Sequence, residues 1–393
     1  YKGNYGYSAC TVDYTDVCYM YSEMKDPFTR YYDPYYTPQI MQQLQSSDIQ
    51  VGLGIEYTFL EKENAIVIMD VFEKSPAKEA GLAANDTIVT IRGTTPSNID
   101  AAQALMDGRE GDVVTLEIKR GNEVLTMKVT LSSFITPTVR VFYQDSIPVI
   151  RITEFTSETV SDSGTYGEFL NALKKTDGAK STIIDLRGNP GGDIDQCQAI
   201  AAELLAEGDT LIIDVETVVD SVLQGFRQVY FQKFDTVTYT TTQDGLGKDR
   251  YYVFLADSNS ASCAERLMSS VTVNKKSPVA GLTTYGKGIG QRVFLTASQG
   301  LALITGLQSI DKDGDVFHKV GIVPDFVSGD PDEQMAKALE WAKDGSMVRT
   351  AGYGTTSTNH FAKEKAASLQ GSPLPKNRRE LLKSLGGATY FRK

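Results

Sequence analysis

Histidine is scarce in this chain: only His318 and His360 occur among 393 residues. A serine hydrolase with a histidine base would therefore have to use one of these two. Positive charge is also in the minority, because 39 lysines and arginines stand against 50 aspartates and glutamates, for a formal net charge of −11. No basic face is evident that could neutralise phosphates, so we expect no nucleic-acid partner.

Cysteine is limited to four residues, Cys10, Cys18, Cys197 and Cys263. Their spacing matches no zinc-binding pattern, because no C-x-x-C pair is accompanied by a second pair or by suitable histidines. We therefore expect no metal site. The first two cysteines are close enough in sequence for a local disulfide in an oxidising compartment, but two free thiols are an equally open interpretation.

Long apolar runs are absent, so the sequence predicts neither a transmembrane segment nor a secretory signal. The chain begins at Tyr1 rather than Met, and we expect a mature or trimmed form from which any export signal or lipid anchor has been removed. Hydrophobic residues nevertheless make up 41% of the chain, enough for a sizeable core. The length predicts two or three domains.

The pattern of residues changes three times along the chain. Residues 1–47 are rich in tyrosine and read as a helical segment. Residues 48–134 read as a compact β-module of five or six short strands with two helices. Residues 135–345 alternate apolar strands with helices, which indicates an α/β fold with a largely parallel sheet. Residues 346–393 are polar and read as a peripheral C-terminal tail.

Ser262 lies in the run Ser-Ala-Ser-Cys-Ala-Glu at 260–265, between the expected strand at 251–255 and an expected helix. A serine at such a junction is exposed at the carboxyl edge of a sheet. The free N–H groups of the first helical turn favour developing negative charge beside it. Helix capping is the simpler interpretation of this segment taken alone.

Lys287 lies between two glycines in the run Tyr-Gly-Lys-Gly-Ile-Gly-Gln at 285–291. Burial of a lysine in such a crowded place lowers its pKa, so that it can act as a base near neutral pH. An exposed lysine on a flexible glycine loop is the simpler alternative. The run is not a Walker loop, because Gly288 follows the lysine where Ser or Thr is required.

A third segment, Asp-Leu-Arg-Gly-Asn-Pro-Gly-Gly at 185–192, follows a buried strand and precedes a helix. Its successive glycine N–H groups could converge on one anion. The alternative is an ordinary tight connection between a strand and a helix.

Together, these three ordered segments resemble those of the carboxyl-terminal processing peptidases, also called tail-specific proteases, of peptidase family S41. The segment Lys-Asp-Pro-Phe-Thr-Arg-Tyr-Tyr-Asp-Pro at 25–34 is similar to the family's D-P-Y-T-R-Y-L-D-P. The segment Gly-Ile-Val-Pro-Asp at 321–325 is similar to its G-I-x-P-D. The resemblance covers about residues 20–345 and implies a ClpP/crotonase-like α/β core that carries a PDZ domain.

The resemblance also implies a role for each matching residue. Ser262 would be the nucleophile, Lys287 its general base, and Gln291 the residue that orients the lysine. The oxyanion hole would consist of the backbone N–H of Cys263 and one from Gly191 or Gly192. The reaction would be peptide hydrolysis through an acyl-enzyme with no cofactor, and the scarcity of histidine fits such a Ser-Lys pair.

Within the β-module, the carboxylate-binding loop of the PDZ domain would be formed by Gly52, Leu53, Gly54 and Ile55. Its N–H groups would hold the free C-terminus of a protein or peptide substrate that ends in an apolar residue, while the peptide adds as a strand. An ordinary glycine turn is the alternative. The family often has a basic residue near the end of the last PDZ strand, but Ser132-Ser133 stands there in this chain.

We therefore expect an exported endopeptidase, in the bacterial periplasm or cell envelope, that trims proteins near their C-termini. Whether it forms a homo-oligomer is left open. Two other classes compete with this prediction. One is a catalytically silent PDZ-containing scaffold, which the presence of Ser262, Lys287 and Gln291 disfavours. The other is non-proteolytic acyl chemistry of the crotonase type, in which a peptide-binding module would have nothing to bind.

Overall fold

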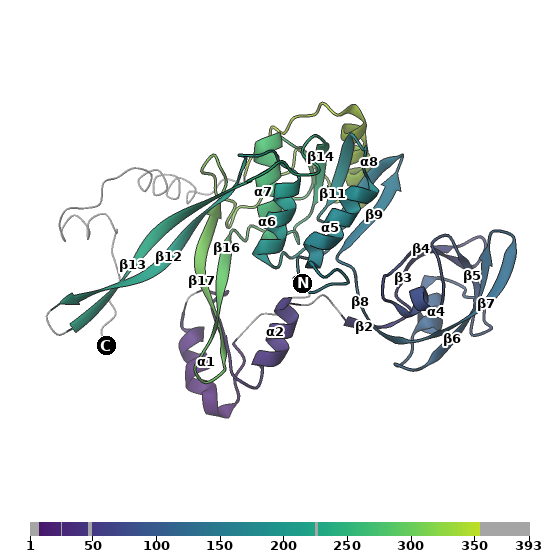
Figure 1. Ribbon diagram of the computed structural model, residues 1–393, viewed down its shortest axis with the longest axis horizontal. Coiled ribbons are helices and arrows are strands. Elements are labelled where there is room, and N and C mark those ends of the chain that lie inside the picture. Colours follow the sequence, from purple (N-terminus) through teal and green to yellow (C-terminus); the bar gives the residue numbers. More distant parts are fainter. Residues whose placement is uncertain (1–7, 25, 46–48, 225–226, 354–393) are drawn as a thin grey trace. The chain divides into compact units, whose positions relative to one another are not determined.

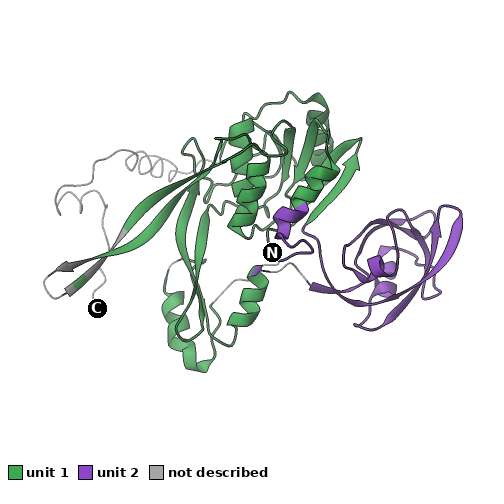
Figure 2. Cartoon of the chain, in the orientation of Figure 1, with its two compact units in different colours: residues 1–44, 139–155, 169–393 green, residues 45–138, 156–168 purple. Residues whose placement is uncertain are grey.

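The computed structural model describes residues 8–24, 26–45, 49–224 and 227–353, which form two compact units (Figure 2). The core unit comprises the chain up to residue 44, residues 139–155 and the chain from residue 169. The β-unit comprises residues 45–138 and 156–168. The module expected at 48–134 therefore lies within the β-unit, whereas the N-terminal segment belongs to the core unit.

The core unit is built on a six-stranded sheet in the order β18-β15-β14-β11-β10-β9 (Figure 1). All neighbouring strands are parallel except the β9–β10 pair at one edge. The central strands are buried along nearly their whole length, as apolar strands covered on both faces must be. The strands are β9 (Val139–Gln144), β10 (Ile147–Ile152), β11 (Ser181–Asp185), β14 (Tyr251–Ala256), β15 (Val279–Gly281) and β18 (Phe326–Val327).

Helices lie on both faces of this sheet. Helix α8 packs through Met335, Leu339 and Trp341 against apolar side chains of the central strands. In Figure 1, α5, α6 and α7 stand together in front of the sheet, and α8 lies behind it. The helices of this part of the chain are α5 (Gly164–Lys175), α6 (Ile194–Glu203), α7 (Cys263–Lys275) and α8 (Pro331–Asp344).

A second sheet of the core unit has the order β1-β17-β12-β13, with β16 also paired to β17. None of its strands was predicted from the sequence. The β12–β13 hairpin is long and extends away from the helices in Figure 1. Its strands are β1 (Arg30–Tyr32), β12 (Thr210–Gln224), β13 (Arg227–Thr240), β16 (Ile289–Leu295) and β17 (Leu301–Ile310).

The N-terminal segment is fixed to this second sheet. Strand β1 pairs antiparallel with β17, and α2 (Thr37–Gln45) packs over Tyr32 and Leu301. The segment before it contains a 3-10 helix, η1 (Val12–Tyr14), and α1 (Thr15–Ser22). A disulfide joins Cys10 to Cys18, so of the two interpretations left open by the sequence the structure has the bonded one.

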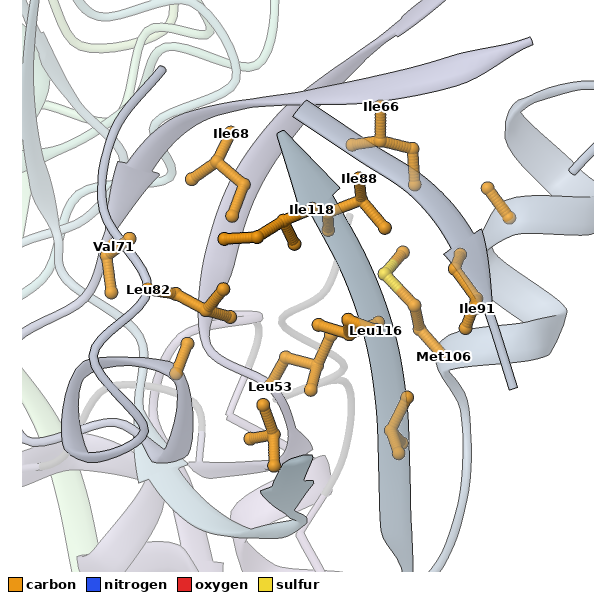
Figure 3. Packing of buried hydrophobic residues seen from close by; sticks show 14 of the residues in the cluster. Leu53, Ile66, Ile68, Val71, Leu82, Ile88, Ile91, Met106, Leu116 and Ile118 are labelled. Carbon is orange, nitrogen blue, oxygen red and sulfur yellow. The ribbon is translucent and has the colours of Figure 1, made fainter. Parts of the chain in front are cut away.

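The β-unit has its own hydrophobic core between a five-stranded antiparallel sheet, in the order β3-β4-β5-β6-β7, and two helices (Figure 3). Leu53, Ile66, Ile88 and Leu116 are among its buried residues. Strand β3 lies at an edge of the sheet. The elements are β2 (Ile49–Gly52), β3 (Ile55–Leu60), β4 (Ala65–Val71), α3 (Pro76–Glu79), β5 (Thr87–Ile91), α4 (Ile99–Met106), β6 (Val113–Arg120), β7 (Glu123–Thr130) and β8 (Ser132–Ile135).

The predicted peripheral tail begins with residues that are held by the core unit. Arg349 forms an ion pair with Asp325 at 3.0 Å, and both side chains are buried. The Tyr353 hydroxyl bonds with Ser269 and with Asp311. The rest of the tail, residues 354–393, lies outside the described residues. Within the described ranges, no helix combines the length and the apolar character needed to cross a bilayer.

Candidate active site

Ser262 connects the end of strand β14 to helix α7, as the sequence predicted. It is the N-cap residue of α7 and has φ 54° and ψ −113°. Such a conformation is rare for a residue with a side chain and persists only where the surroundings enforce it. The neighbouring backbone supplies this constraint: Ala261 N–H donates to the Asn189 carbonyl, and Arg266 N–H donates to the Ser262 carbonyl, both at 2.9 Å.

The glycine loop passes directly against this serine. A Cβ atom on Gly191 would lie 2.7 Å from the Cβ of Ser262 and 2.9 Å from the amide nitrogen of Cys263. A Cβ atom on Gly192 would lie 2.0 Å from the carbonyl oxygen of Phe155. Both glycines also have positive φ angles, 101° and 140°. Glycine is therefore required at both positions, so that the loop can approach Ser262.

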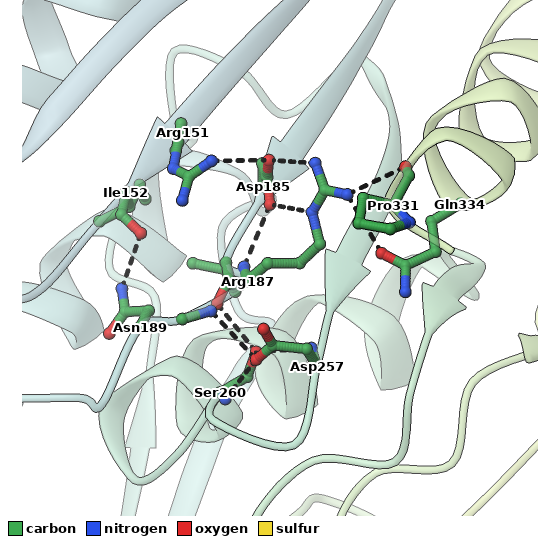
Figure 4. A network of polar contacts seen from close by, with 11 residues as sticks. Arg151, Ile152, Asp185, Arg187, Asn189, Asp257, Ser260, Pro331 and Gln334 are labelled. Carbon is green, nitrogen blue, oxygen red and sulfur yellow. Dashed lines mark hydrogen bonds and ion pairs between the residues drawn. The ribbon is translucent and has the colours of Figure 1, made fainter. Parts of the chain in front are cut away.

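A network of polar contacts holds the glycine loop at 185–192 in place (Figure 4). The guanidinium of Arg187 bonds to both oxygens of the buried Asp185 carboxylate and to the side chain of Gln334 on α8. The side chain of Asn189, which is fully buried, donates to the Ile152 carbonyl at 3.0 Å and accepts Gly191 N–H at 2.8 Å. The conformation of the loop is thus set by side chains whose roles were not predicted from the sequence.

The first serine of the Ser-Ala-Ser run has a structural role. The hydroxyl of Ser260 donates to the Leu186 carbonyl at 2.8 Å and accepts Asp257 N–H at 2.9 Å. Its own carbonyl accepts the N–H of Tyr285 at 3.0 Å, just before the lysine loop. Ser260 therefore joins the strand-to-helix turn, the glycine loop and the lysine loop.

Two N–H groups beside Ser262 remain available for an oxyanion. Cys263 is the first residue of α7, and within the described residues no acceptor is bonded to its N–H or to that of Gly192. The N–H of Gly191, by contrast, is used by the side chain of Asn189. Of the two glycines left open by the sequence, Gly192 is therefore the better placed donor.

Glu265, in the first turn of α7, has a buried carboxylate that accepts four hydrogen bonds. Its role was not predicted from the sequence. Its carboxylate accepts Ser262 N–H at 2.9 Å, Gly286 N–H at 2.6 Å and Lys287 N–H at 2.7 Å. It also accepts the Thr284 hydroxyl at 2.5 Å. Burial raises the pKa of Glu265, while these four hydrogen bonds lower it. The carboxylate holds the lysine loop against the start of helix α7.

Lys287 is brought into the same site. Ser262 and Lys287 both line a small cavity whose other walls include Cys263, Leu307 and Phe317. The pKa of Lys287 is lowered to about 8, first by burial and then by the charge of Arg30, while Glu265 and Asp26 act in the opposite direction. The described hydrogen bonds do not include one between the hydroxyl of Ser262 and Nζ of Lys287. The interpretation as an exposed lysine is excluded by this burial.

Gln291 lies on β16, at the start of the strand that follows the lysine loop. Its side-chain nitrogen donates to the Thr305 hydroxyl at 3.1 Å, and no hydrogen bond in the described part of the chain joins it to Lys287. His318, the other candidate base, lies beside the lysine loop, where burial lowers its pKa. In the described ranges, no group of three or more His, Cys, Asp or Glu side chains is gathered as a metal site would require.

A disulfide joins Cys263, the residue after Ser262, to Cys197 on α6. Helix α6 follows directly on the glycine loop, so the bond connects the two segments that carry the candidate oxyanion donors. This pair was not predicted from the sequence, in which the two cysteines are 66 residues apart. Their placement at the starts of two helices becomes meaningful only when the helices are packed side by side.

In the β-unit, the predicted carboxylate-binding loop runs from the end of β2 to the start of the edge strand β3. The carbonyls of Leu53 and Gly54 accept the N–H groups of Ala77 and Phe72, at 2.8 and 3.0 Å. The N–H groups of Leu53 and Gly54 have no hydrogen-bond acceptor among the described residues. Gly54 has a φ of 76°, and a Cβ atom there would lie 2.3 Å from the Cβ of Ser75.

Comparisons with known proteins agree with this arrangement. Residues 146–328 match the family model described as peptidase family S41, and residues 51–131 match that of the PDZ domain. A probable CtpA-like serine protease of Staphylococcus haemolyticus is 29% identical over 334 residues, which cover 84% of this chain and 62% of that protein. A protein of the same description from Staphylococcus aureus is 27% identical over 326 residues, or 81% of this chain and 60% of the relative. The chain thus spans about three fifths of the length of these curated relatives.

Solved structures with a similar chain course include the photosystem II D1 C-terminal processing protease, with a TM-score of 0.46 and 20% identity. That match covers 81% of this chain and 82% of the other. A putative S41 protease from Bacteroides fragilis gives a TM-score of 0.43 at 16% identity, covering 82% of this chain and 85% of that one.

Proposed function

We propose that this chain is a serine endopeptidase that processes proteins near their C-termini, because residues 146–328 match the model of peptidase family S41 and residues 51–131 match that of the PDZ domain. The observation that carries the proposal is the placement of Ser262 and Lys287 on one cavity, with a lysine pKa lowered to about 8. At that pKa, about a tenth of the lysine side chains are neutral at pH 7 and can accept a proton.

In the proposed reaction, neutral Lys287 takes the hydroxyl proton of Ser262 as the oxygen attacks the scissile carbonyl. Substrate binding must first bring the two side chains within hydrogen-bond reach. The tetrahedral oxyanion is then stabilised by the N–H groups of Cys263 and Gly192 at the positive end of the α7 dipole. The ammonium of Lys287 returns the proton to the leaving amine, which leaves an acyl-enzyme on Ser262.

Hydrolysis of the acyl-enzyme repeats these roles with water as the nucleophile. Lys287 accepts a proton from the water, the new oxyanion occupies the same two N–H groups, and the proton returns to Ser262. The strained backbone of Ser262 keeps its hydroxyl at the start of the helix, where the Cys263 and Gly192 N–H groups can donate to the oxygen of the carbonyl that the serine attacks.

The PDZ domain is proposed to bind the free C-terminus of the substrate. The unused N–H groups of Leu53 and Gly54 can hold a carboxylate, and the edge strand β3 can pair with the incoming peptide. An apolar last residue would lie beside Leu105 of α4, which packs against the core of the domain. An amide cap removes the charge of the carboxylate, so amidated peptides should bind much more weakly to the full Ser262→Ala chain in calorimetry.

An exported location is also proposed, in the periplasm or cell envelope. The support is chemical: all four cysteines are joined in two disulfides, and disulfides persist in oxidising compartments. Alkylation of the native protein under denaturing conditions should find no free thiol.

The proposal is tested by incubating candidate proteins with the wild-type chain and with its Ser262→Ala form, followed by mass analysis of their C-termini. We expect shortened C-termini only with the wild type. Lys287→Ala and Lys287→Arg should both lose two to four powers of ten in rate, since neither can accept the serine proton. Cleavage that survives in both lysine variants would contradict the dyad, and intact substrates in every reaction would favour a silent binding protein.

A further inference from the structure

A turn near the N-terminus forms one wall around Lys287, although it is far from the lysine in sequence. The ring of Phe28 faces the lysine side chain, with Nζ 5.0 Å from the ring centroid. This distance lies within the range in which an ammonium group is attracted to the face of an aromatic ring. The turn is part of the core unit, like the lysine loop itself.

The turn is built to hold this ring in place. The carboxylate of Asp26 accepts Phe28 N–H at 3.0 Å and the Thr29 hydroxyl at 2.6 Å. The Thr29 hydroxyl in turn accepts Thr305 N–H at 3.0 Å, which fastens the turn to strand β17. Arg30, the next residue, begins β1 and pairs with Leu303 of the same strand. The backbone that carries Phe28 is therefore held on both sides of this residue.

Gln291 reaches the same anchor. Its side-chain nitrogen donates to the hydroxyl of Thr305, the residue whose N–H holds the turn. The glutamine is thus connected to the lysine through β17, the turn and Phe28. This route gives a physical account of how Gln291 can affect Lys287 without a hydrogen bond to it.

We propose that Phe28 is a positioning residue for the general base: its ring excludes water from Lys287 and faces the ammonium that forms when the lysine accepts a proton. This inference rests on the Ser262–Lys287 chemistry proposed above. The ring does not touch the reacting atoms in this account and acts only through the lysine. The turn at 26–30 is then a component of the active site.

The ring has two opposing effects on the pKa of Lys287, and we expect water exclusion to outweigh the attraction between the ring and the ammonium. Water exclusion favours neutral Lys287, and burial is the principal cause of its lowered pKa. The attraction between the ammonium and the ring favours the charged form more weakly. Loss of the ring should therefore raise the pKa of Lys287. The charged and titratable groups that face the lysine are Asp26 and Arg30 on the N-terminal segment, Glu265 on α7 and His318 on the loop after β17.

The test compares Phe28→Ala with Phe28→Tyr, which keeps the ring face, and with Tyr19→Ala, which removes an exposed aromatic from the same N-terminal segment. Two quantities are measured for each variant. One is the pH dependence of kcat/KM for a peptide substrate. The other is the pH dependence of Lys287 acetylation by trace acetic anhydride, followed by mass spectrometry in a Ser262→Ala background. The second measurement needs no proteolysis, so it tests the environment of the lysine even where the proposed function fails.

We expect Phe28→Ala to move both midpoints up by about one pH unit, with a roughly tenfold loss of kcat/KM at pH 7 that is recovered at high pH. Phe28→Tyr and Tyr19→Ala should keep the wild-type midpoints. An equal loss at every pH with an unchanged acetylation midpoint would overturn the inference, and so would no change at all. If Phe28→Ala does not fold, Thr29→Val replaces it, because this change removes the hydroxyl that anchors the turn. Thr29→Val should give a smaller upward shift of both midpoints. Unshifted midpoints in this variant would overturn the inference too.

Discussion

Glu265 and Lys287 are joined by a hydrogen bond of 2.7 Å, in which the buried carboxylate accepts the backbone N–H of the lysine. The other donors to this carboxylate include the N–H of Ser262. One side chain therefore fixes the backbone of Ser262 and that of Lys287 relative to each other. The geometry of the proposed dyad depends on this residue, although Glu265 need not touch the substrate.

The first prediction concerns Glu265→Gln. Each carboxylate oxygen accepts two donors, so replacing either oxygen by an amide NH₂ leaves two buried donors without an acceptor. We expect the free energy of unfolding to fall by about 2–4 kcal/mol and turnover to fall at least about tenfold. Glu333→Gln, on the exposed face of α8, is the matched control. Unchanged turnover in a folded Glu265→Gln protein would show that the Glu265 carboxylate is not needed for activity.

The second prediction separates backbone strain from obstruction of the site. Gly191 and Gly188 both have positive φ, but only at Gly191 would a Cβ atom collide with the nucleophile turn. Either alanine substitution should lower the free energy of unfolding by about 1 kcal/mol, because alanine is strained at a positive φ. Gly191→Ala should also abolish labelling of Ser262 by a serine-reactive probe, whereas Gly188→Ala should retain it. Equal labelling of the two variants would contradict the close approach.

The third prediction concerns the two disulfides. Cys197–Cys263 closes a long loop and connects the helices beside the candidate oxyanion donors, so Cys197→Ser should lower the free energy of unfolding by about 2–4 kcal/mol. It should also slow turnover. Cys18→Ser breaks the other disulfide, which lies in the N-terminal segment, and should leave turnover near its wild-type value. The comparison is made by chemical denaturation and steady-state kinetics, and loss of turnover only in Cys18→Ser would reverse the assignment.

The fourth prediction follows from the lowered pKa of Lys287. A lysine whose pKa falls from 10.5 to about 8 on folding opposes folding at every pH below about 8, and this penalty disappears as the pH rises from 8 to 10.5. Lys287→Met should therefore stabilise the fold at pH 7, by up to about 3 kcal/mol. The gain should shrink above pH 8 in urea denaturation series. A gain that is independent of pH would show that the lysine is not desolvated.

Much of the fold was predictable because its signals are local. The buried strand at 181–185, the helix that starts after Ser262 and the small β-module are each encoded by short apolar runs and by glycine or proline positions. The long β12–β13 hairpin escaped prediction. Its strands mix apolar and polar residues, so they lack the continuous apolar runs that marked the buried strands.

The candidate site was predictable where a motif carried it, at Ser262 and Lys287. Residues that act through long-range contacts were not. Phe28 meets the lysine only because β1 pairs with β17, and Cys197 meets Cys263 only because α6 packs on α7. The motif at 25–34 is recognisable in the sequence, but the sequence does not indicate that it lies next to Lys287 in the fold.

The most direct test of the Ser262–Lys287 dyad is the rate of acyl-enzyme formation on Ser262 as a function of pH, followed by rapid quench and peptide mass mapping. We expect a rate that rises with pH, with a midpoint near the lysine pKa of about 8, and that is lost in Lys287→Arg at all pH values. His318→Ala should keep this profile. A midpoint between about pH 6 and 7 that survives in Lys287→Ala and disappears in His318→Ala would contradict the dyad and assign the base to the histidine.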